Sequence, residues 1–598
     1  MAMRFSRRAG VSLLALIFIT AAVLTSPSQS AENIIDPNEG WALPNSTGVI
    51  GSQNALFTES SGFSNYSALV VNSKLSDDQV DPTCSSTSDV KCDFSDFSFS
   101  AQIPICQNQT DENCIESFGA IDQNSVDHPG VFQSYYPVKA QNEYLGNPDW
   151  NLPSGVSGSL FTIPGVSGPA GNTYYVDLGM SGRGSTRQSP KVTLSAVAAS
   201  ITPVQIQDIS AHINGSKWCK TPTGLCDVGY GLIGPDSNGK LRWGMEGNGG
   251  ADGIHKCVAT SWAERSCAQK EAFPAGFKFY LKARFTLPPV GWLHGRLRDP
   301  NISVTQSNGV TQILVSAEPV AVPTVYKAYL WSEMPTELRA LYDPNTGNYI
   351  LGGGGGFVRS NLTTNPLLRA STTAPNPYSK SAITELTAWL PYVDNKASSL
   401  PHYWIFNSLA QEELAGANKC FTNPSQLNGI VTTNSSVYSP GPPSFDKAAG
   451  DLNYQVAAPH YTNSGDVFRG TYDLVMRSTV ARCVYGFSNA PIKASISVVS
   501  ASGAPQVATT VVSEKDDWLH LSANNFEFSA PTVKVSLQQD VAAVTATPTP
   551  TPTPTQSASE AQAQQTSAKK TSIICVKGKM TKKVVAVNPT CPKGYKKK

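Results

Sequence analysis

Apolar and polar residues alternate with a period of two along several segments of this chain. In residues 277–285, FKFYLKARF, every second residue is apolar and the residues between them are lysine, tyrosine or arginine. Residues 472–476 and 533–537 repeat this alternation. Because successive side chains of a strand point to opposite faces, the pattern predicts half-buried antiparallel strands. The dipeptides Asn238-Gly239 and Asn308-Gly309 predict hairpin turns between such strands.

One region, residues 326–430, departs from this alternation. Residues 332–342 and 381–390 space their apolar side chains as a helix does, and a proline ends the second segment. A third helix is predicted from Ser408, because its spacing to Gln411 is that of a capping box. Five consecutive glycines in the same region predict a mobile loop. The fold class that follows is mainly β, with antiparallel sandwich-like domains and a helix-bearing section.

The first 30 residues have the pattern of a secretory signal peptide. Arg4, Arg7 and Arg8 precede an apolar run, and small residues allow cleavage after Ser30. The apolar run, residues 11–24, is shorter than the about 20 residues that cross a bilayer. We therefore predict a secreted protein, extracellular or associated with the cell envelope, whose mature chain has no membrane span.

The C-terminal end combines a proline-rich stalk with a lysine-rich segment. Alternating threonine and proline over residues 545–555 predicts an extended, disordered stalk, roughly 30 Å long in its proline part. Residues 571–598 are too few for a hydrophobic core of their own. Their apolar residues suit a hairpin, and a Cys575–Cys591 bridge would contribute about 3 kcal/mol by restricting the unfolded chain. We therefore predict a small disulfide-closed tail.

These patterns divide the chain into parts. The predicted parts are a signal peptide at 1–30, an N-terminal β-rich region at 31–150, a β-sandwich-like domain at 151–325, the helix-bearing section at 326–430, a second β-sandwich-like domain at 431–544, a Pro/Thr and Ser/Ala/Gln linker at 545–570, and the cationic tail at 571–598. Short fragments recur along the body but not in colinear order, so no internal duplication is predicted.

The charge of the chain is unevenly distributed. The chain has 45 basic and 44 acidic residues, but its last 30 residues carry ten lysines and no acid. Without these lysines and the three signal arginines, 32 basic residues remain against 44 acidic ones. A body with this excess of acids repels phosphate, so no nucleic acid partner is predicted.

The tail, with its positive charge, is predicted to bind anionic cell-wall polymers. Its candidate residues are Lys577, Lys579, Lys582, Lys583, Lys593, Lys596, Lys597 and Lys598. Two alternatives are open: a sorting signal that an export system reads, and a solvated charge run without a partner.

Twelve cysteines, an even number in a chain predicted to be exported, indicate disulfides. The pairs predicted from closeness in sequence are Cys84–Cys92, Cys106–Cys114, Cys219–Cys226, Cys257–Cys267, Cys420–Cys483 and Cys575–Cys591. The sequence does not fix the connectivity. No Cys-x-x-Cys pair occurs, so we predict neither a metal site nor a cofactor.

The stalk followed by CVKGKMTKKVVAVNPTCPKGYKKK resembles the C-terminal tails of secreted actinobacterial proteins, especially those of freshwater lineages. The body is similar to large exported proteins of the same bacteria in GWLHGRLRDP, residues 291–300, and in TYDLVMRSTVARCVYGFSNAP, residues 471–491. The resemblance implies an exported protein and no particular activity.

No catalytic constellation emerges from the motifs. The chain lacks a His-Glu-x-x-His helix, a Gly-x-Ser-x-Gly elbow and a Walker loop. The most suggestive surface is a predicted strand face that carries Trp292, His294 and Arg296. If exposed, this face could stack on a sugar ring and hydrogen-bond its hydroxyls. The alternative is a packing role, which aromatic strand positions usually have.

The leading hypothesis is an exported cell-surface protein with a non-catalytic structural, adhesive or glycan-binding role, held at the envelope by its cationic tail. The alternative is a secreted hydrolase that acts on polysaccharide or peptide, with its site in loops around residues 326–421. A cleft with two facing carboxylates would favour the hydrolase, whereas convex sandwiches would favour a binding protein.

Overall fold

The chain splits into two compact units, Met1–Asp540, called the body below, and Val541–Lys598. This computed structural model describes residues 38–39, 41, 49, 51–59, 67–71, 83–137, 143–169, 171–208, 230–235, 241–245, 257–261, 264, 266–343, 357–359, 367, 370–409, 414, 417–423, 425–488, 492–499, 505–506, 509–528, 532–539, 571–577, 580–586, 589–593 and 595–597. Strands hold 55% of the described residues and helices 9%, so the predicted mainly β fold is confirmed. Among the described residues, no helix has the length and apolar character needed to cross a membrane. The predicted signal peptide and linker lie outside the described residues.

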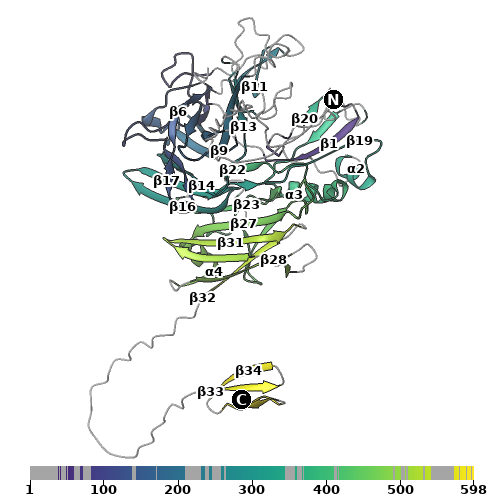
Figure 1. Cartoon of the computed structure of the whole chain (residues 1–598). Helices are drawn as coiled ribbons and strands as arrows, with labels where there is room; N and C mark the ends of the chain where they lie inside the picture. Colours follow the sequence, from purple (N-terminus) through teal and green to yellow (C-terminus); the bar gives the residue numbers. More distant parts are fainter. Residues whose placement is uncertain are drawn as a thin grey trace, which may run out of the picture. The chain divides into compact units, whose positions relative to one another are not determined.

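A large sheet of 15 strands is the centre of the body. Its main path is β2 (Ala68–Val71), β3 (Phe97–Gln102), β8 (Thr173–Gly184), β9 (Val192–Asp208), β22 (His402–Ser408), β15 (Gly291–Arg296), β23 (Leu427–Thr433), β27 (Arg469–Arg477), β31 (Trp518–Glu527) and β30 (Thr509–Lys515). Branches add β6 (Val131–Tyr136), β7 (Gly158–Thr162), β12 (Cys257–Ser261), β13 (Ser266–Lys270) and β18 (Val320–Ala321). Figure 1 shows β9, β22, β23, β27 and β31 following one another across the body. The pairs are antiparallel except β15 with β23.

One face of the large sheet is apolar and packs on a second sheet. The second sheet has five strands, β16 (Arg298–Ser307), β17 (Val310–Glu318), β14 (Phe277–Phe285), β4 (Cys114–Asp122) and β5 (Asp127–Pro129). Leu178 and Phe406 from the large sheet share one buried cluster with Leu281 and Val315 from the second sheet. Burying apolar side chains between two sheets is the arrangement of a β-sandwich.

The opposite face of the large sheet packs on a third sheet near β23, β27 and β31. This sheet contains β24 (Val437–Tyr438), β25 (Ser444–Asp446), β26 (Asp451–Ala457), β28 (Ile492–Val499), β29 (Pro505–Gln506) and β32 (Thr532–Gln539). Tyr472 and Leu474 from β27 share a buried cluster with Val533 and Val535 from β32. Helix α4 (Ser478–Tyr485) adds Val480 to the same cluster and ends at Gly486, whose φ of 69° is left-handed.

The helices of residues 326–430 cover a smaller sheet of four strands. Its strands are β1 (Ser52–Phe57), β19 (Val325–Leu330), β20 (Phe357–Arg359) and β21 (Ala370–Thr373). Helices α2 (Thr336–Tyr342) and α3 (Lys380–Trp389) pack on it through Leu338, Leu386 and Trp389. The Ser379 hydroxyl accepts a hydrogen bond from the Ala382 amide at 3.2 Å and so caps α3. A separate pair, β10 (Tyr230–Pro235) with β11 (Leu241–Met245), completes the described body strands.

Most of the predicted elements are confirmed. Strand β14 coincides with residues 277–285 and alternates between buried and half-buried positions as predicted. Asn308-Gly309 joins β16 to β17, with φ of 52° and 80° at the two residues. Helices α2 and α3 lie in the two segments predicted to be helical. The predicted Asn238-Gly239 turn and the glycine-rich loop lie outside the described residues.

Three expectations need correction. Strand β27 is buried on both faces rather than half-buried, because both clusters of the body meet at it: Val475 faces one cluster and Leu474 the other. Ser408 was predicted to begin a helix, but it is the last residue of β22. Its hydroxyl accepts a hydrogen bond from the Val197 amide at 2.8 Å. The following residues 410–413 lie outside the described part of the chain. Hydrogen bonds of the large sheet cross the boundaries predicted at residues 150, 325 and 430, so the body is one compact unit.

The tail is a small hairpin with a third, very short strand. Its strands are β33 (Thr571–Lys577), β34 (Met580–Ala586) and β35 (Lys596–Lys597). Ile573 pairs with Val584, as expected from their apolar character. Cys575 is fully buried and forms a disulfide with Cys591, 16 residues away in sequence. The predicted disulfide-closed tail is therefore confirmed.

Four of the six predicted disulfides are confirmed: Cys84–Cys92, Cys106–Cys114, Cys420–Cys483 and Cys575–Cys591. Cys267 is also disulfide-bonded. Cys219 and Cys226 lie outside the described residues, as does the side chain of Cys257, so their pairing stays a prediction.

Candidate functional site

The predicted glycan-facing residues lie on β15, in the middle of the large sheet. Trp292, His294 and Arg296 are 0%, 1% and 0% exposed, so these residues have the packing role given above as the alternative, and the candidate glycan-binding face is not exposed. The physical reason is the position of β15 between β22 and β23, where both faces of the sheet are covered. The Trp292 indole donates to the Phe421 carbonyl at 3.0 Å, which satisfies its only donor in the interior.

Arg296 forms a buried ion pair with a residue that is distant in sequence. Its Nε lies 2.6 Å from Oε2 of Glu59, and neither side chain is more than 1% exposed. The guanidinium also donates to the carbonyls of Thr433, Ser435 and Ser436, and it lies 4.4 Å from the ring centre of Tyr438. Burial raises the pKa of Glu59, although Arg296 opposes this shift. The arginine therefore fixes the segment after β1 to the large sheet.

His294 is the next polar residue of this interior. Its Nδ1 lies 2.7 Å from the Tyr438 hydroxyl, and its ring lies 4.6 Å from that of Tyr378. Burial, together with the positive charge of Arg296, lowers the pKa of His294 to about 3. The imidazole is therefore neutral at ordinary pH, and the Tyr438 hydroxyl occupies its Nδ1.

A second set of charges lies closer to the surface. Oε1 of Glu39 lies 2.6 Å from Nδ1 of His402, and it accepts a hydrogen bond from the His402 backbone amide at 2.7 Å. The other carboxylate oxygen of Glu39, Oε2, lies 3.2 Å from the Lys270 ammonium. The ammonium in turn lies 3.7 Å from the ring centre of Tyr403. Burial opposes ionisation of Glu39, but Lys270 and His402 hold its pKa below the ordinary value.

These charges form one alternating series from the surface to the interior. His402, which is 37% exposed, contacts Glu39, and Glu39 also contacts Lys270. The charge of Lys270 acts in turn on Glu59, which is the partner of Arg296. Sequence reasoning missed both glutamates, because 237 residues separate Glu59 from Arg296 and no local pattern links them. The series binds two N-terminal segments to the large sheet, and His402 is its most exposed member.

The structure also brings two carboxylates together at β16 and β27. The Asp299 amide donates to Oδ2 of Asp473 at 3.2 Å, and the Ser522 hydroxyl donates to Oδ1. Burial raises the pKa of Asp473 to about 7. Asp473 is 1% exposed and both its oxygens are occupied. The two acids therefore do not flank an open space, as the carboxylates of a glycoside hydrolase must.

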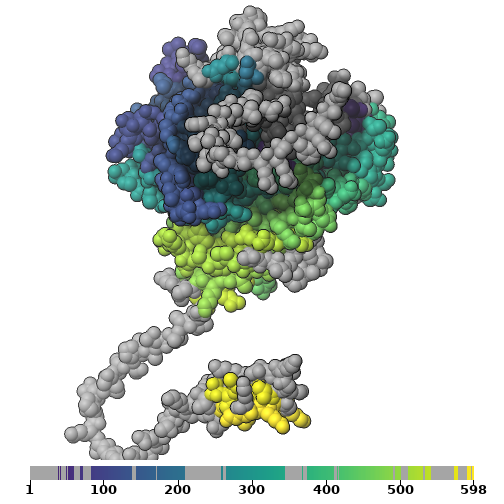
Figure 2. All heavy atoms as spheres, viewed as in Figure 1, coloured from purple at the N-terminus to yellow at the C-terminus, as the bar shows by residue number. Residues whose placement is uncertain are grey.

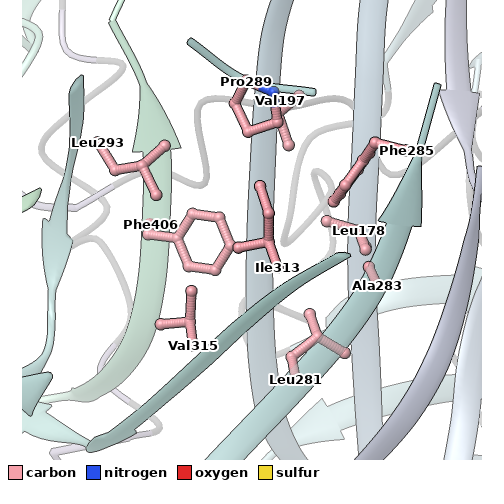
Figure 3. Close-up of a pocket in the computed structure, with 10 residues that line it drawn as sticks. All are labelled: Leu178, Val197, Leu281, Ala283, Phe285, Pro289, Leu293, Ile313, Val315 and Phe406. Atoms are coloured by element: carbon pink, nitrogen blue, oxygen red, sulfur yellow. The ribbon is translucent and has the colours of Figure 1, made fainter. Parts of the chain in front are cut away.

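The described pocket of the body has an entirely apolar lining. It lies between the large sheet and the five-stranded sheet, where Leu281, Val315 and Phe406 point into it (Figure 3). Such a lining offers no group that could transfer a proton or bind a metal, and most of its residues belong to the buried cluster between the two sheets. Within the described ranges, no cluster of three or more His, Cys, Asp or Glu side chains could hold a metal ion.

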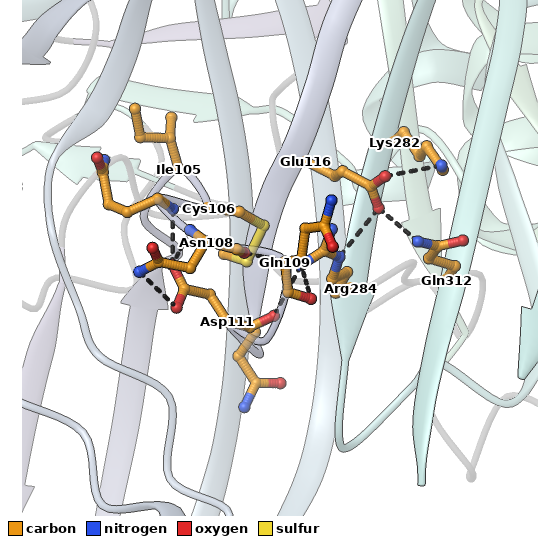
Figure 4. The surroundings of a disulfide bond; sticks show 12 residues. Ile105, Cys106, Asn108, Gln109, Asp111, Glu116, Lys282, Arg284 and Gln312 are labelled. Atoms are coloured by element: carbon orange, nitrogen blue, oxygen red, sulfur yellow. Dashed lines mark hydrogen bonds and ion pairs between the residues drawn. A yellow bond between two sulfur atoms is a disulfide. The ribbon is translucent and has the colours of Figure 1, made fainter. Parts of the chain in front are cut away.

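A network of charges supports the Cys106–Cys114 loop on the surface of the five-stranded sheet (Figure 4). Arg284 donates to the carbonyls of Asn108 and Gln109 at 3.0 and 2.7 Å, and its Nε lies 3.1 Å from Glu116. Lys282 lies 2.8 Å from the same glutamate. The charges and hydrogen-bonding groups of this network are paired with one another, so we assign it a structural role at the surface.

The tail carries the remaining candidate residues. Lys593, Lys596 and Lys597 are exposed, as wall binding would require. Lys579 and Lys598 lie outside the described residues, as do the side chains of Lys577, Lys582 and Lys583. Binding by any of these lysines stays a prediction.

Comparison with known proteins gives no further guide to the site, since neither a known family model nor a curated protein matches this sequence.

Proposed function

We propose that this protein is exported and acts at the cell surface, where its β-rich body has a non-catalytic structural, adhesive or glycan-binding role. A cationic tail holds it at the envelope by binding anionic wall polymers. The observation that carries this proposal is the separate compact unit at the C-terminus, closed by a disulfide and exposing lysines at its end.

Three features support the anchoring role. The last 30 residues have ten lysines and no acid, so this segment has no acidic side chain to neutralise them. The Cys575–Cys591 bridge keeps so short a segment folded without a large core. The body has an excess of acids, so attraction to an anionic polymer has to come from the tail.

The burial of polar residues in the body favours a structural role for it. Trp292, His294 and Arg296 pack inside it, and the Asp299–Asp473 pair is closed. The hydrolase alternative gains no facing pair of carboxylates from the described residues, so no observation favours it over the surface role.

A charge substitution tests the anchor. We expect Lys593→Gln, Lys596→Gln and Lys597→Gln together to lower the fraction of the mature protein that pellets with purified Gram-positive walls, and to reduce the effect of salt on pelleting. The matched control removes three exposed lysines of the body, with Lys419→Gln, Lys447→Gln and Lys515→Gln. If both triple variants pellet like the parent, the exposed lysines of the tail do not bind the wall.

A further inference from the structure

A fully buried carboxylate lies where α2 and α3 pack on the four-stranded sheet, in the green part of the body (Figure 2). Glu385, in the middle of α3, is 0% exposed, and so are Leu386 and Trp389 of the same helix. Leu386 and Trp389 belong to the apolar cluster that joins α3 to this sheet. A carboxylate in such a place has lost its hydration, so its ionised form is costly unless the protein replaces the lost hydrogen bonds.

The hydrogen bonds of Glu385 replace little of that hydration. Its Oε2 accepts one bond, from the Tyr342 hydroxyl, at the long distance of 3.4 Å. The Tyr342 hydroxyl itself accepts a bond from the Trp389 indole at 2.7 Å. Oε1 of Glu385 has no hydrogen-bond partner in the part of the chain that the structure describes. Burial, which the bond from Tyr342 opposes, raises the pKa of Glu385 to about 7.

The elements around α3 offer Glu385 no compensating positive charge from their described residues. Their titratable and charged residues are Glu337, Arg339 and Tyr342 of α2, Tyr326, Lys327 and Tyr329 of β19, Tyr392 of η4 (Leu390–Val393), Tyr438 of β24, and Asp451 and Tyr454 of β26. Of these groups, only Tyr342 acts on the charge of Glu385. Ionisation of Glu385 therefore leaves a buried charge without a counterion from these elements.

Tyr342 connects this carboxylate to the sheet. Thr373 of β21 hydrogen-bonds the Tyr342 hydroxyl, and the Gln53 side chain of β1 donates to Thr373 at 3.0 Å. The polar groups of α2, α3, β1 and β21 thus meet beside Glu385. A charge that forms there acts on the packing of both helices against the sheet.

We propose that Glu385 makes the docking of α3 on the four-stranded sheet pH-dependent, so that α3 is held at acid pH and opens more often as the pH rises. Docked α3 keeps the proton of Glu385 up to a pKa of about 7, whereas an open, hydrated α3 releases it at the ordinary value of 4.5. Between these values, each unit of pH favours the open form by up to about tenfold. Opening exposes Leu386 and Trp389, the apolar face of α3. This inference does not depend on the anchoring role of the tail.

Hydrogen exchange of the full mature protein, followed by mass spectrometry and corrected for the intrinsic rate at each pH, measures this opening. We expect the protection of a peptide that contains residues 380–389 to be about tenfold lower at pH 8 than at pH 6. A peptide from β22 is the internal reference and should keep its protection. Glu385→Gln keeps the shape of the side chain but cannot ionise, so the tenfold difference should disappear.

The control, Glu333→Gln, makes the same chemical change at an exposed acid before α2 and should behave like the parent. If Glu385→Gln does not fold by circular dichroism, Tyr342→Phe decides, because it removes the hydrogen bond that favours ionised Glu385. A larger difference between the two pH values in Tyr342→Phe then supports the proposal, and an unchanged or smaller one overturns it. Equal protection of α3 at both pH values in the parent, an equal decline in β22, or a decline that Glu385→Gln retains also overturns it.

Discussion

The body and the tail are stabilised in different ways, although both are made of antiparallel strands. The body buries apolar side chains on both faces of one large sheet, and its interior also holds paired charges such as Arg296 with Glu59. The tail has three short strands and one bridge, Cys575–Cys591. The difference shows that the body depends on packing across long sequence distances, whereas the tail depends on a covalent bond within 16 residues.

The largest expected effect concerns the buried ion pair of the body. Arg296→Met leaves Glu59 buried without its partner, so we expect the free energy of unfolding of the body to fall by about 3–5 kcal/mol. Urea unfolding followed by tryptophan fluorescence measures this, because all ten tryptophans lie in the body. Adding Glu59→Leu should restore part of the loss.

The matched control for this variant is Arg298→Met, two residues along the chain. Arg298 is 51% exposed and pairs with Glu318, so its loss should cost at most about 1 kcal/mol. Equal losses in the free energy of unfolding for Arg296→Met and Arg298→Met would contradict the larger stabilising effect expected of the buried pair.

The second effect concerns the tail alone. Replacing Cys575 and Cys591 with serine should remove about 3 kcal/mol, which exceeds what so small a hairpin gains from packing. We expect trypsin to cleave the tail much faster, while the fluorescence transition of the body stays unchanged. The companion variant, Cys84→Ser with Cys92→Ser, should destabilise the body in the fluorescence transition and leave the rate of trypsin cleavage of the tail unchanged. A tail that stays protected without its bridge would refute the covalent account.

A third, smaller effect is pH-dependent and belongs to the body. Burial raises the pKa of Asp473 to about 7, while in the unfolded chain the ordinary value is about 3.9. Between these values the folded body keeps a proton that the unfolded chain releases, so this group lowers stability as the pH rises from about 4 to 7. Asp473→Asn should flatten that decline and stabilise the body at pH 8 by up to about 2 kcal/mol.

Urea unfolding at pH 5 and pH 8 checks this expectation. Asp516→Asn, at an exposed turn, should leave the pH profile as it is. A profile of Asp473→Asn that parallels the parent would mean that Asp473 does not carry the raised pKa.

The smallest effect concerns the surface network of the Cys106–Cys114 loop. Arg284→Gln removes the donors to Asn108 and Gln109 and the ion pair with Glu116, and should cost about 1 kcal/mol. Arg469→Gln breaks a more exposed pair with Glu527 and should cost less in the same urea titration. The reverse order would show that the loop carbonyls do not depend on Arg284.

Local patterns predicted the local parts of this fold. The alternation at 277–285, the Asn308-Gly309 turn and the stripe of α3 depend on residues close in sequence, and so do the tail hairpin and its bridge. Helix α4 was missed, although Gly486 and the spacing of Val480, Ala481 and Val484 are helical signals.

The candidate site could not be predicted in the same way. The polar and apolar residues of β15 alternate as those of a half-exposed strand do, which suggested an accessible face. In the folded body, Glu59 and Tyr438 satisfy Arg296 and His294 from distant parts of the chain. Burial of polar residues therefore depends on partners that only the tertiary structure brings together.

The anchoring role of the tail is tested most directly by pelleting the mature protein and a version ending at Ser567 with purified Gram-positive cell walls, at low and at high salt. The account predicts that only the full-length chain pellets and that high salt releases it, because the attraction is electrostatic. Equal pelleting of both versions would place the wall-binding surface on the body, and pelleting of neither would contradict anchoring to the wall.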